Sequence, residues 1–272
     1  MSAFTTAFVG AGNMSRSIIS GLIASGVDAD AISASNPSEG PLEELRQLGL
    51  VTLSKNNLSV VETADVIVLA VKPQIMQSVC EELAAVIRTE QLVISVAAGV
   101  AADSLHRWSG GRADIVRCMP NTPSQLAAGA SGLFARASVS AANRQRAEEV
   151  MRAVGLVRWV EDETLLHAVT AVAGSAPAYF FQFMEAMIAE AQRMGLDEET
   201  ARTLCAQTCI GAGRMLAEGD VDAGELRRRV CSPNGATERA VAAFSAAGLE
   251  HIVSKAMQEC YARSEEMGRE LS

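Results

Sequence analysis

A short glycine-containing stretch near the amino terminus is the first candidate for chemistry. The stretch Gly10-Ala11-Gly12-Asn13-Met14-Ser15 follows a β-branched run at 6–9 and precedes an apolar pattern of helical period at 15–25. The first glycine allows a tight turn, and the second lets backbone amides approach a pyrophosphate at the positive end of the helix. The third position of this fingerprint is Ser15 rather than glycine. A G-x-G pair alone is a common turn, but the strand–turn–helix context favours dinucleotide binding.

The next informative position lies about twenty residues further on, where the second strand should end. Proteins that bind NAD usually place Asp or Glu there, to accept hydrogen bonds from the ribose hydroxyls. This chain has Ser35-Asn36-Pro37-Ser38 instead. With no carboxylate to repel a 2′-phosphate, the segment favours NADP, although no arginine stands nearby and Asn-Pro-Ser could simply be a turn.

Three further loops follow predicted strands and should face the same crevice. They are 70–73 (Ala-Val-Lys-Pro), 95–99 (Ser-Val-Ala-Ala-Gly) and 118–123 (Cys-Met-Pro-Asn-Thr-Pro). Small residues there would let a flat ring lie close to the backbone, and Asn121 could hydrogen-bond it. Lys72 is one of only three lysines among 23 basic residues, but a lone lysine is more often a solvated surface group.

Two segments of the carboxyl-terminal half are candidates for binding a substrate anion. Gly174 and Pro177 interrupt an otherwise long helical pattern and should kink it and free backbone amides. The segment 232–237 (Ser-Pro-Asn-Gly-Ala-Thr) opens a later helix, and helix starts bind anions such as carboxylates. A helix cap without any ligand is the alternative for this second segment.

The elements that must position these residues change character near residue 160. Strands are predicted at 6–9, 31–34, 66–71, 92–96, 115–118 and 156–160, with helices at 15–25, 42–48, 75–87 and 141–154. Beyond residue 160 only helices are expected, at 163–194, 198–217, 223–229 and 235–264. The pattern predicts an α/β protein with a doubly wound parallel sheet of Rossmann type in residues 1–160 and an all-helical domain in residues 161–272.

Composition excludes several other classes of protein. The net charge of −9 lacks the basic stripe of a nucleic-acid reader, so we expect no nucleic-acid partner. The six cysteines lack the spacing of metal ligands, which favours buried thiols and no metal. No signal peptide is evident, and the uncharged stretch 168–184 is too short for a membrane span, so we expect a buried helix there and a cytoplasmic protein.

Taken together, six motifs resemble the pyrroline-5-carboxylate reductase family over nearly the whole chain. They are G-A-G-N-M, L-A-V-K-P, S-V-A-A-G, R-C-M-P-N-T-P, G-S-A-P-A-Y and S-P-N-G-A-T, in the family's order and at its separations, and the last two are the most specific. The resemblance implies reduction of the ring imine of Δ1-pyrroline-5-carboxylate to L-proline, the last step of proline biosynthesis, with NADPH or, alternatively, NADH. It also implies a homodimer formed through the helical domain, with a larger ring of dimers as a further assembly.

The resemblance assigns roles residue by residue. The implied cofactor-binding residues are Gly10, Ala11, Gly12, Asn13, Met14, Ser35, Asn36, Asn57, Ala70, Val71, Lys72, Pro73, Ala97, Ala98 and Asn121. The implied substrate-binding residues are Ser175, Gly235, Ala236 and Thr237, of which Thr237 is the catalytic residue that would hydrogen-bond the ring nitrogen. Two positions depart from the family pattern, because Asn234 and Ala176 stand where glycine is usual. If the backbone at residue 234 requires a positive φ, asparagine is the next best residue after glycine.

Two other readings of the chain remain to be weighed. A β-hydroxyacid dehydrogenase shares the two-domain plan but resembles this chain only at the first glycine loop, and it places a lysine on the long helix after the sheet. No lysine occurs here between Lys72 and Lys255. A non-catalytic NADPH-binding regulator would have no need of the two substrate motifs. His167 and His251 occupy ordinary helix positions, which favours packing or surface roles for both.

Overall fold

The computed structural model describes residues 4–50 and 52–271. The strands among them are β1 (Thr6–Val9), β2 (Ile32–Ser35), β3 (Thr52–Ser54), β4 (Val66–Leu69), β5 (Leu92–Ser95), β6 (Asp114–Met119), β7 (Gly129–Ala135) and β8 (Gly155–Trp159). The α-helices are α1 (Asn13–Ala24), α2 (Glu39–Gln47), α3 (Asn57–Val61), α4 (Met76–Leu83), α5 (Ala102–Trp108), α6 (Ala141–Arg152), α7 (Leu165–Val169), α8 (Ala176–Arg193), α9 (Glu198–Glu218), α10 (Ala223–Val230), α11 (Ala236–Ala246) and α12 (Leu249–Glu270). Short 3-10 turns are η1 (Ala29–Ala31), η2 (Pro73–Ile75) and η3 (Thr122–Leu126), and η4 (Thr170–Gly174) is a π-helical turn.

These elements divide into two compact units. The first unit runs to Pro177 and resumes at Glu259, and the second unit is Ala178–Gln258. The domain boundary predicted between residues 160 and 161 lies directly after β8, whereas the compact units divide within α8 and α12. A helix that begins in one unit and continues into the other is therefore shared between them.

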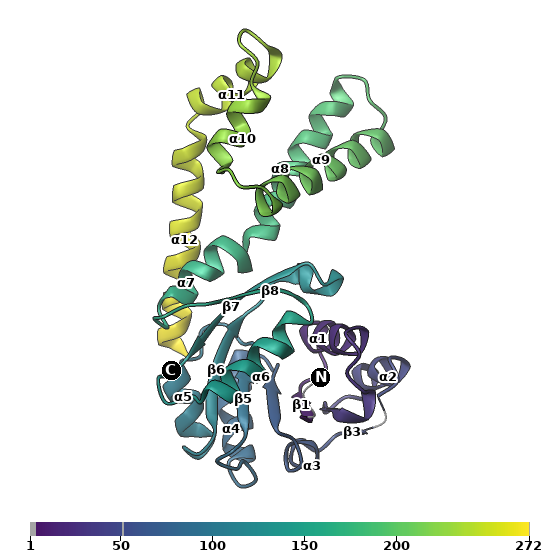
Figure 1. Ribbon diagram of the computed structural model, residues 1–272, viewed down its shortest axis with the longest axis vertical. Coiled ribbons are helices and arrows are strands. Elements are labelled where there is room, and N and C mark those ends of the chain that lie inside the picture. The colour runs from purple at the N-terminus through teal and green to yellow at the C-terminus, as the bar shows by residue number, and fades with distance from the viewer. Residues whose placement is uncertain (1–3, 51, 272) are drawn as a thin grey trace. The chain divides into compact units, whose positions relative to one another are not determined.

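A single sheet organises the first unit (Figure 1). Its strand order is β3-β2-β1-β4-β5-β6-β7-β8, in which the first six strands are parallel. This order and the helices between the strands confirm the predicted Rossmann-type class. The sequence pattern missed β3 and β7, and β7 runs antiparallel to β6. A three-residue strand and the glycine- and alanine-containing run 129–135 carry too weak a β-pattern to be recognised.

Both faces of the sheet are buried because successive side chains of a strand point to opposite sides. In β4, Val66 and Val68 pack with α1, α2 and α6 in one apolar cluster, while Ile67 and Leu69 pack with α3, α4 and α5 in another. The continuous apolar run predicted to be a central buried strand is therefore confirmed. This two-sided burial leaves only the sheet's edges and strand ends to contact a ligand.

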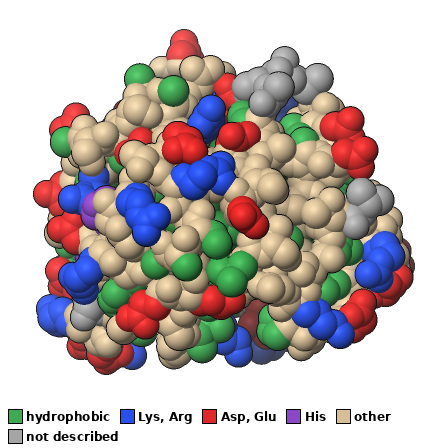
Figure 2. Space-filling model, turned by 90° about the horizontal axis from the view of Figure 1, so that it is seen from below, with side chains coloured by type: hydrophobic (Ala, Val, Ile, Leu, Met, Phe, Trp, Pro, Cys, Tyr) green, Lys and Arg blue, Asp and Glu red, His purple; other side chains and the backbone are tan. Residues whose placement is uncertain are grey.

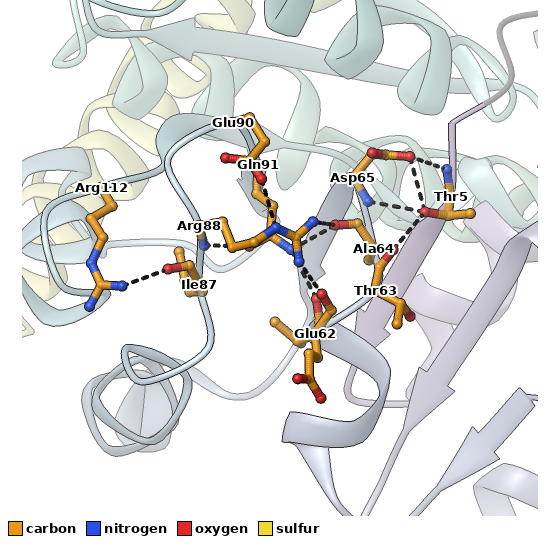
Figure 3. Close-up of polar contacts among 11 residues, drawn as sticks. Thr5, Glu62, Thr63, Ala64, Asp65, Ile87, Arg88, Glu90, Gln91 and Arg112 are labelled. Carbon is orange, nitrogen blue, oxygen red and sulfur yellow. Dashed lines mark hydrogen bonds and ion pairs between the residues drawn. The ribbon is translucent and has the colours of Figure 1, made fainter.

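Polar side chains form hydrogen bonds with backbone groups of the loops at the amino ends of the strands (Figure 3). Asp65 accepts hydrogen bonds at Oδ2 from the backbone N and Oγ1 of Thr5, at 2.8 and 3.0 Å. Nε2 of the fully buried Gln91 donates to the Ala64 carbonyl at 2.6 Å, and Nη2 of Arg88 donates to the same oxygen at 3.4 Å. The loops at this end of the sheet thus bind one another.

The helices of the second unit begin and end at recognisable signals. Asp197 and Asp222 cap α9 and α10 by accepting from the backbone N of Thr200 and Glu225 at 2.9 and 2.8 Å. Gly195, at φ +104°, ends α8 in the left-handed conformation. The single helix predicted at 235–264 is wrong in one respect, because it breaks between α11 and α12 at Gly248, where φ is +79°.

The second unit buries very little of its own apolar surface. Among residues 178–258, only Ala201 and Cys205 are buried. Phe180 and Phe181 are 59% and 63% exposed. The prediction that 168–184 forms a buried helix is therefore wrong for the single chain. An exposed apolar face of this kind needs another surface to cover it.

The molecular surface and the helices also bear on the partners expected from the composition. Acidic and basic side chains are interspersed over the face drawn in Figure 2. Such mixing differs from the continuous basic stripe that a nucleic-acid reader presents. Within residues 4–50 and 52–271, no helix combines the length and the apolar character needed to cross a membrane.

Candidate dinucleotide and substrate site

The carboxyl ends of β1, β2 and β4 meet where the strand order reverses. β1 lies between β2 and β4, and the helices that follow β1 and β4 pack on opposite faces of the sheet. A crevice forms outside the strand ends at such a reversal, and dinucleotides bind there in folds of this type. The structure therefore brings the predicted loops after these three strands to one edge.

The glycine loop shows the two roles expected of its glycines. Gly10 has φ +98°, and a Cβ atom on it would lie 2.7 Å from the Ala70 carbonyl oxygen, so only glycine fits this turn. Gly12 has an extended backbone, and a Cβ atom there would have nothing within 4 Å. The space over Gly12 is open at the amino end of α1, in front of Asn13 and Met14. A pyrophosphate fits this cradle, since amides and the helix dipole face it.

A side-chain relay occupies the corner predicted to receive the adenosine ribose. Ser35 Oγ donates to Asn57 Oδ1 at 2.8 Å, and Asn57 Nδ2 donates to Glu82 Oε2 at 3.0 Å. Asn36 accepts at Oδ1 from the Ala11 backbone N at 3.3 Å, which connects this corner to the glycine loop. Three predicted residues from two segments, Ser35 and Asn36 from one and Asn57 from the other, thus form hydrogen bonds with one another or with the glycine loop.

Glu82 is a residue of this corner that the sequence pattern did not single out. It lies on α4, 25 residues from Asn57, and no local spacing signals their contact. Through Asn57 it supplies a carboxylate near the ribose corner, although not at the end of β2 where such a group usually stands.

The loops after β4 and β5 lie next to the glycine loop along the sheet edge. The Ala70 backbone N donates to the Val9 carbonyl at 2.9 Å, and Val71 follows it. Lys72 is exposed and precedes Pro73, the first residue of η2. After β5, Ala97 is buried and donates its N–H to Ser95 Oγ at 3.4 Å, and Ala98 follows. No bulky side chain stands at 70, 97 or 98 to occupy the edge.

Asn121, which follows β6, forms hydrogen bonds with β7 and η4. Its Nδ2 donates to the Ala173 carbonyl at 3.1 Å, and its Oδ1 accepts from the Ala130 backbone N at 2.9 Å. The side chain therefore connects β6, β7 and η4. One amide hydrogen remains for the nicotinamide contact that the resemblance implies.

The predicted helix break at 173–179 is a π-helical turn. Ser175 donates its backbone N–H to the Thr170 carbonyl at 2.8 Å, and its Oγ lies 3.3 Å from Cys260 Sγ. A Cβ atom on Gly174 would lie 2.4 Å from Cε of Met119, the flexible end of that side chain, so the turn packs directly against the residue that ends β6. The Ser175 amide is already used in the turn, which leaves its hydroxyl as the group able to bind a substrate.

The segment before α11 forms the turn expected of an anion-binding helix start. Asn234 has φ +58°, a conformation that glycine and asparagine adopt more readily than most residues. Gly235 donates its own N–H to the Ser232 carbonyl at 2.9 Å, and Glu238 Oε2 accepts from the Asn234 backbone N at 2.7 Å. The donors that remain toward a carboxylate are therefore the Ala236 and Thr237 amides and the Thr237 hydroxyl, rather than the Gly235 amide.

Histidine, cysteine and metal chemistry find little support in the described residues. His167 Nδ1 lies 2.8 Å from Ser264 Oγ, and burial, followed by the charge of Arg117, lowers the pKa of this histidine. Burial raises the pKa of Cys80 and of Cys118 to about 12, so both thiols stay protonated. Within 4–50 and 52–271, no group of three His, Cys, Asp or Glu side chains is placed to hold a metal ion.

The sheet order, the open glycine cradle and the small-residue strand ends define a class of protein, the dinucleotide-dependent oxidoreductases with a Rossmann-type domain and a helical region. Residues 5–99 match the family model described as NADP oxidoreductase, coenzyme F420-dependent. Residues 163–267 match the model described as pyrroline-5-carboxylate reductase dimerisation. The second match shows that the helical part of the chain resembles a dimerisation region.

Whole-length relatives narrow the class to a family. Pyrroline-5-carboxylate reductase from Pseudomonas aeruginosa is 46% identical over 271 residues, which cover 100% of this chain and 99% of that protein. A solved pyrroline-5-carboxylate reductase from Coxiella burnetii is 41% identical with a TM-score of 0.93, covering 98% of this chain and 99% of that one. The Plasmodium falciparum pyrroline carboxylate reductase with NADP bound shares the fold at a TM-score of 0.86 and 24% identity, covering 98% and 99%. The chain belongs to the pyrroline-5-carboxylate reductase family.

Proposed function

We propose that this protein is an NADPH-dependent reductase that converts Δ1-pyrroline-5-carboxylate to L-proline. Similarity over the whole chain to reductases of that name is the observation that carries the proposal. The NADP oxidoreductase match supports NADPH as the cofactor, and the open cradle at Gly12 supports binding of either dinucleotide. NADH remains the alternative donor.

The chemistry is shared between the cofactor and the chain. When bound, NADPH supplies a hydride from its nicotinamide ring. A protonated imine is already electrophilic, so the chain need not provide a strong acid. Its work is to bind the substrate carboxylate through the Ala236 and Thr237 amides and the Ser175 hydroxyl, and to hold the ring nitrogen through the Thr237 hydroxyl.

The other predicted residues divide along the dinucleotide. Gly10, Ala11, Gly12, Asn13 and Met14 hold the pyrophosphate in this proposal. Ser35 and Asn36 bind the adenosine ribose or its phosphate, and Asn57 lies near the adenosine moiety. Ala70, Val71, Lys72, Pro73, Ala97, Ala98 and Asn121 line the remainder and the nicotinamide.

Assembly as a homodimer is part of the proposal. A groove of about 590 Å³ runs between α8 and α9, and Phe181 and Ile188 line it together with charged residues. The exposed apolar side chains of the second unit and the dimerisation match both support a partner copy there. Thr237 is exposed in the single chain, which suits an active site that draws the 232–237 loop from the partner. A larger ring of dimers and a cytoplasmic location also stay predictions.

The test is an assay of NADPH oxidation with pyrroline-5-carboxylate, with proline identified as the product. We expect turnover with this substrate and none with β-hydroxyacids. Tight NADPH binding without any turnover would instead indicate a non-catalytic NADPH-binding regulator.

A further inference from the structure

Lys55 lies beside Ser35 and Asn36 of the predicted ribose corner, although it is far from those two residues in the sequence. β3 pairs with β2 in parallel, with Ser54 opposite Ser35. The Asn36 backbone N donates to the Ser54 carbonyl at 3.1 Å. Lys55, the residue after Ser54, therefore lies at the same end of the paired strands as Asn36. The label β3 marks this edge of the sheet in Figure 1.

No other cation is supplied by the loop that follows β2. Residues 36–45 contain no lysine or arginine, and Arg46 lies at the far end of α2. Arg16, on α1, forms an ion pair with Glu44. Lys55 directly follows β3, the strand paired with β2, whereas Arg46 approaches from α2 and contacts the opposite oxygen of Glu39.

The present partner of Lys55 is a carboxylate that an anion could replace. Lys55 Nζ lies 3.0 Å from Glu39 Oε2, and the two side chains are 61% and 57% exposed. The pKa of Glu39 is lowered chiefly by this contact with Lys55, with a smaller effect of Arg46. Exposed pairs of this kind contribute little to stability, so a more highly charged anion competes well for the lysine.

Two carboxylates at this corner make a cation necessary if a 2′-phosphate is to bind. Glu39 is the first residue of α2, and Glu82 is hydrogen-bonded to Asn57. A dianionic phosphate near Ser35 and Asn36 would be repelled by both. The ammonium of Lys55 offsets that repulsion, and Arg46, 3.5 Å from Glu39 Oε1, can retain the displaced carboxylate.

We propose that Lys55 recognises the 2′-phosphate of NADPH by exchanging Glu39 for the phosphate, and that Lys55 and Glu39 together set the preference for NADPH over NADH. The proposal rests on the proposed use of NADPH. It makes Lys55 a specificity residue and Glu39 its internal competitor.

The experiment measures binding by calorimetry, without any substrate. The ligands are the pair NADPH and NADH and the fragment pair 2′,5′-ADP and 5′-AMP. The two members of each pair differ only by the 2′-phosphate. Lys55→Met should weaken NADPH and 2′,5′-ADP roughly ten- to a hundredfold, the range expected for one hydrogen bond to a charged group, and should leave NADH and 5′-AMP within about twofold. Glu39→Gln should tighten 2′,5′-ADP, and Lys55→Arg should retain most of the affinity.

Arg152→Met is the matched control, because it also removes one exposed cation from the first unit but lies on α6. It should leave all four affinities unchanged. An unchanged NADPH affinity in Lys55→Met, or an equal loss with NADH, would overturn the proposal. A protein that binds 2′,5′-ADP through Lys55 yet never reduces pyrroline-5-carboxylate would contradict the proposed function and not this inference.

Discussion

The two compact units of this chain differ in how much of their own core they complete. In the first unit, apolar side chains fill two clusters on either face of an eight-stranded sheet. In the second, only Ala201 and Cys205 of residues 178–258 are buried. A helical unit that leaves its apolar side chains in water is stable only when another surface covers them. The candidate dinucleotide loops therefore belong to a unit with its own core, whereas the apolar side chains of the helical unit need a covering surface, in keeping with the match of this region to a dimerisation model.

The largest expected effect comes from placing a charge on the uncovered helical surface. Phe181→Glu should prevent dimer formation, since burying an unpaired carboxylate costs several kcal/mol, and should reduce activity by at least about a hundredfold. Sedimentation and turnover on the same samples measure both effects. Leu156→Glu, which alters a 55% exposed leucine on β8, is the control expected to leave association intact. An active, stable monomer of the unaltered chain would refute the inference that the helical unit needs a partner chain.

A smaller effect is expected at the substrate residue of the second unit. Thr237→Ala should lower kcat/KM roughly ten- to a hundredfold, because it removes one hydrogen bond to a charged nitrogen, worth about 1.5–3 kcal/mol. Thr237→Ser keeps the hydroxyl and should recover much of the loss, while NADPH affinity stays nearly constant. Full activity of the alanine variant would place the substrate elsewhere, and a loss above about a millionfold would make Thr237 a chemical participant.

The glycine loop allows a matched pair of changes within the first unit. Gly12→Ala should fold normally, because its Cβ meets nothing within 4 Å, yet weaken NADPH about tenfold or more by occupying the phosphate's place. Gly10→Ala should instead lower the melting temperature, since φ is +98° and its Cβ would press on the Ala70 carbonyl. Thermal unfolding and NADPH titration of both variants separate the two outcomes. If Gly12→Ala bound NADPH as tightly as the unaltered protein, the assignment of the pyrophosphate to this cradle would be wrong.

Cofactor preference offers a subtler change at the ribose corner. The unaltered protein should use NADPH with higher kcat/KM than NADH. Ser35→Asp should reverse that order, because a carboxylate at the end of β2 repels the 2′-phosphate and accepts from ribose hydroxyls. Steady-state kinetics with both cofactors measure the ratio, and a native preference of several-fold for NADH would contradict this assignment.

The smallest effect on activity is expected at the amino ends of the strands. Gln91 is fully buried and donates to the Val61 and Ala64 carbonyls at 2.9 and 2.6 Å. Gln91→Leu should lower the free energy of unfolding by about 2–4 kcal/mol, while the affinity for NADPH stays unchanged. The Val61 and Ala64 carbonyls would each lose one donor, and the Arg88 backbone N would lose the Gln91 Oε1 acceptor at 2.7 Å. Denaturant titration beside NADPH titration tests this separation of stability from function.

How far the sequence predicts the structure depends on whether a signal is local. The alternation of strands and helices, the buried run at 66–69 and the glycine loop could all be recognised, because each follows from the steric or apolar character of neighbouring residues. The replacement of the usual glycine by Asn234 also has a local explanation, because φ is +58° there and asparagine tolerates that conformation. The break at Gly248 was missed, since an isolated glycine inside a helical pattern does not by itself end a helix.

The sequence alone determined the class of fold and the segments that carry the candidate site, since those depend on residues adjacent in the chain. Only the tertiary structure decided that Lys55 and Glu82 stand near Ser35, that β7 runs antiparallel to β6, and that the Ser175 and Gly235 amides are already used. These contacts depend on strand order, on helix placement and on where each backbone donor finds its acceptor. No local pattern encodes them, because the groups that meet are brought together by burial of the sheet and helices as a whole.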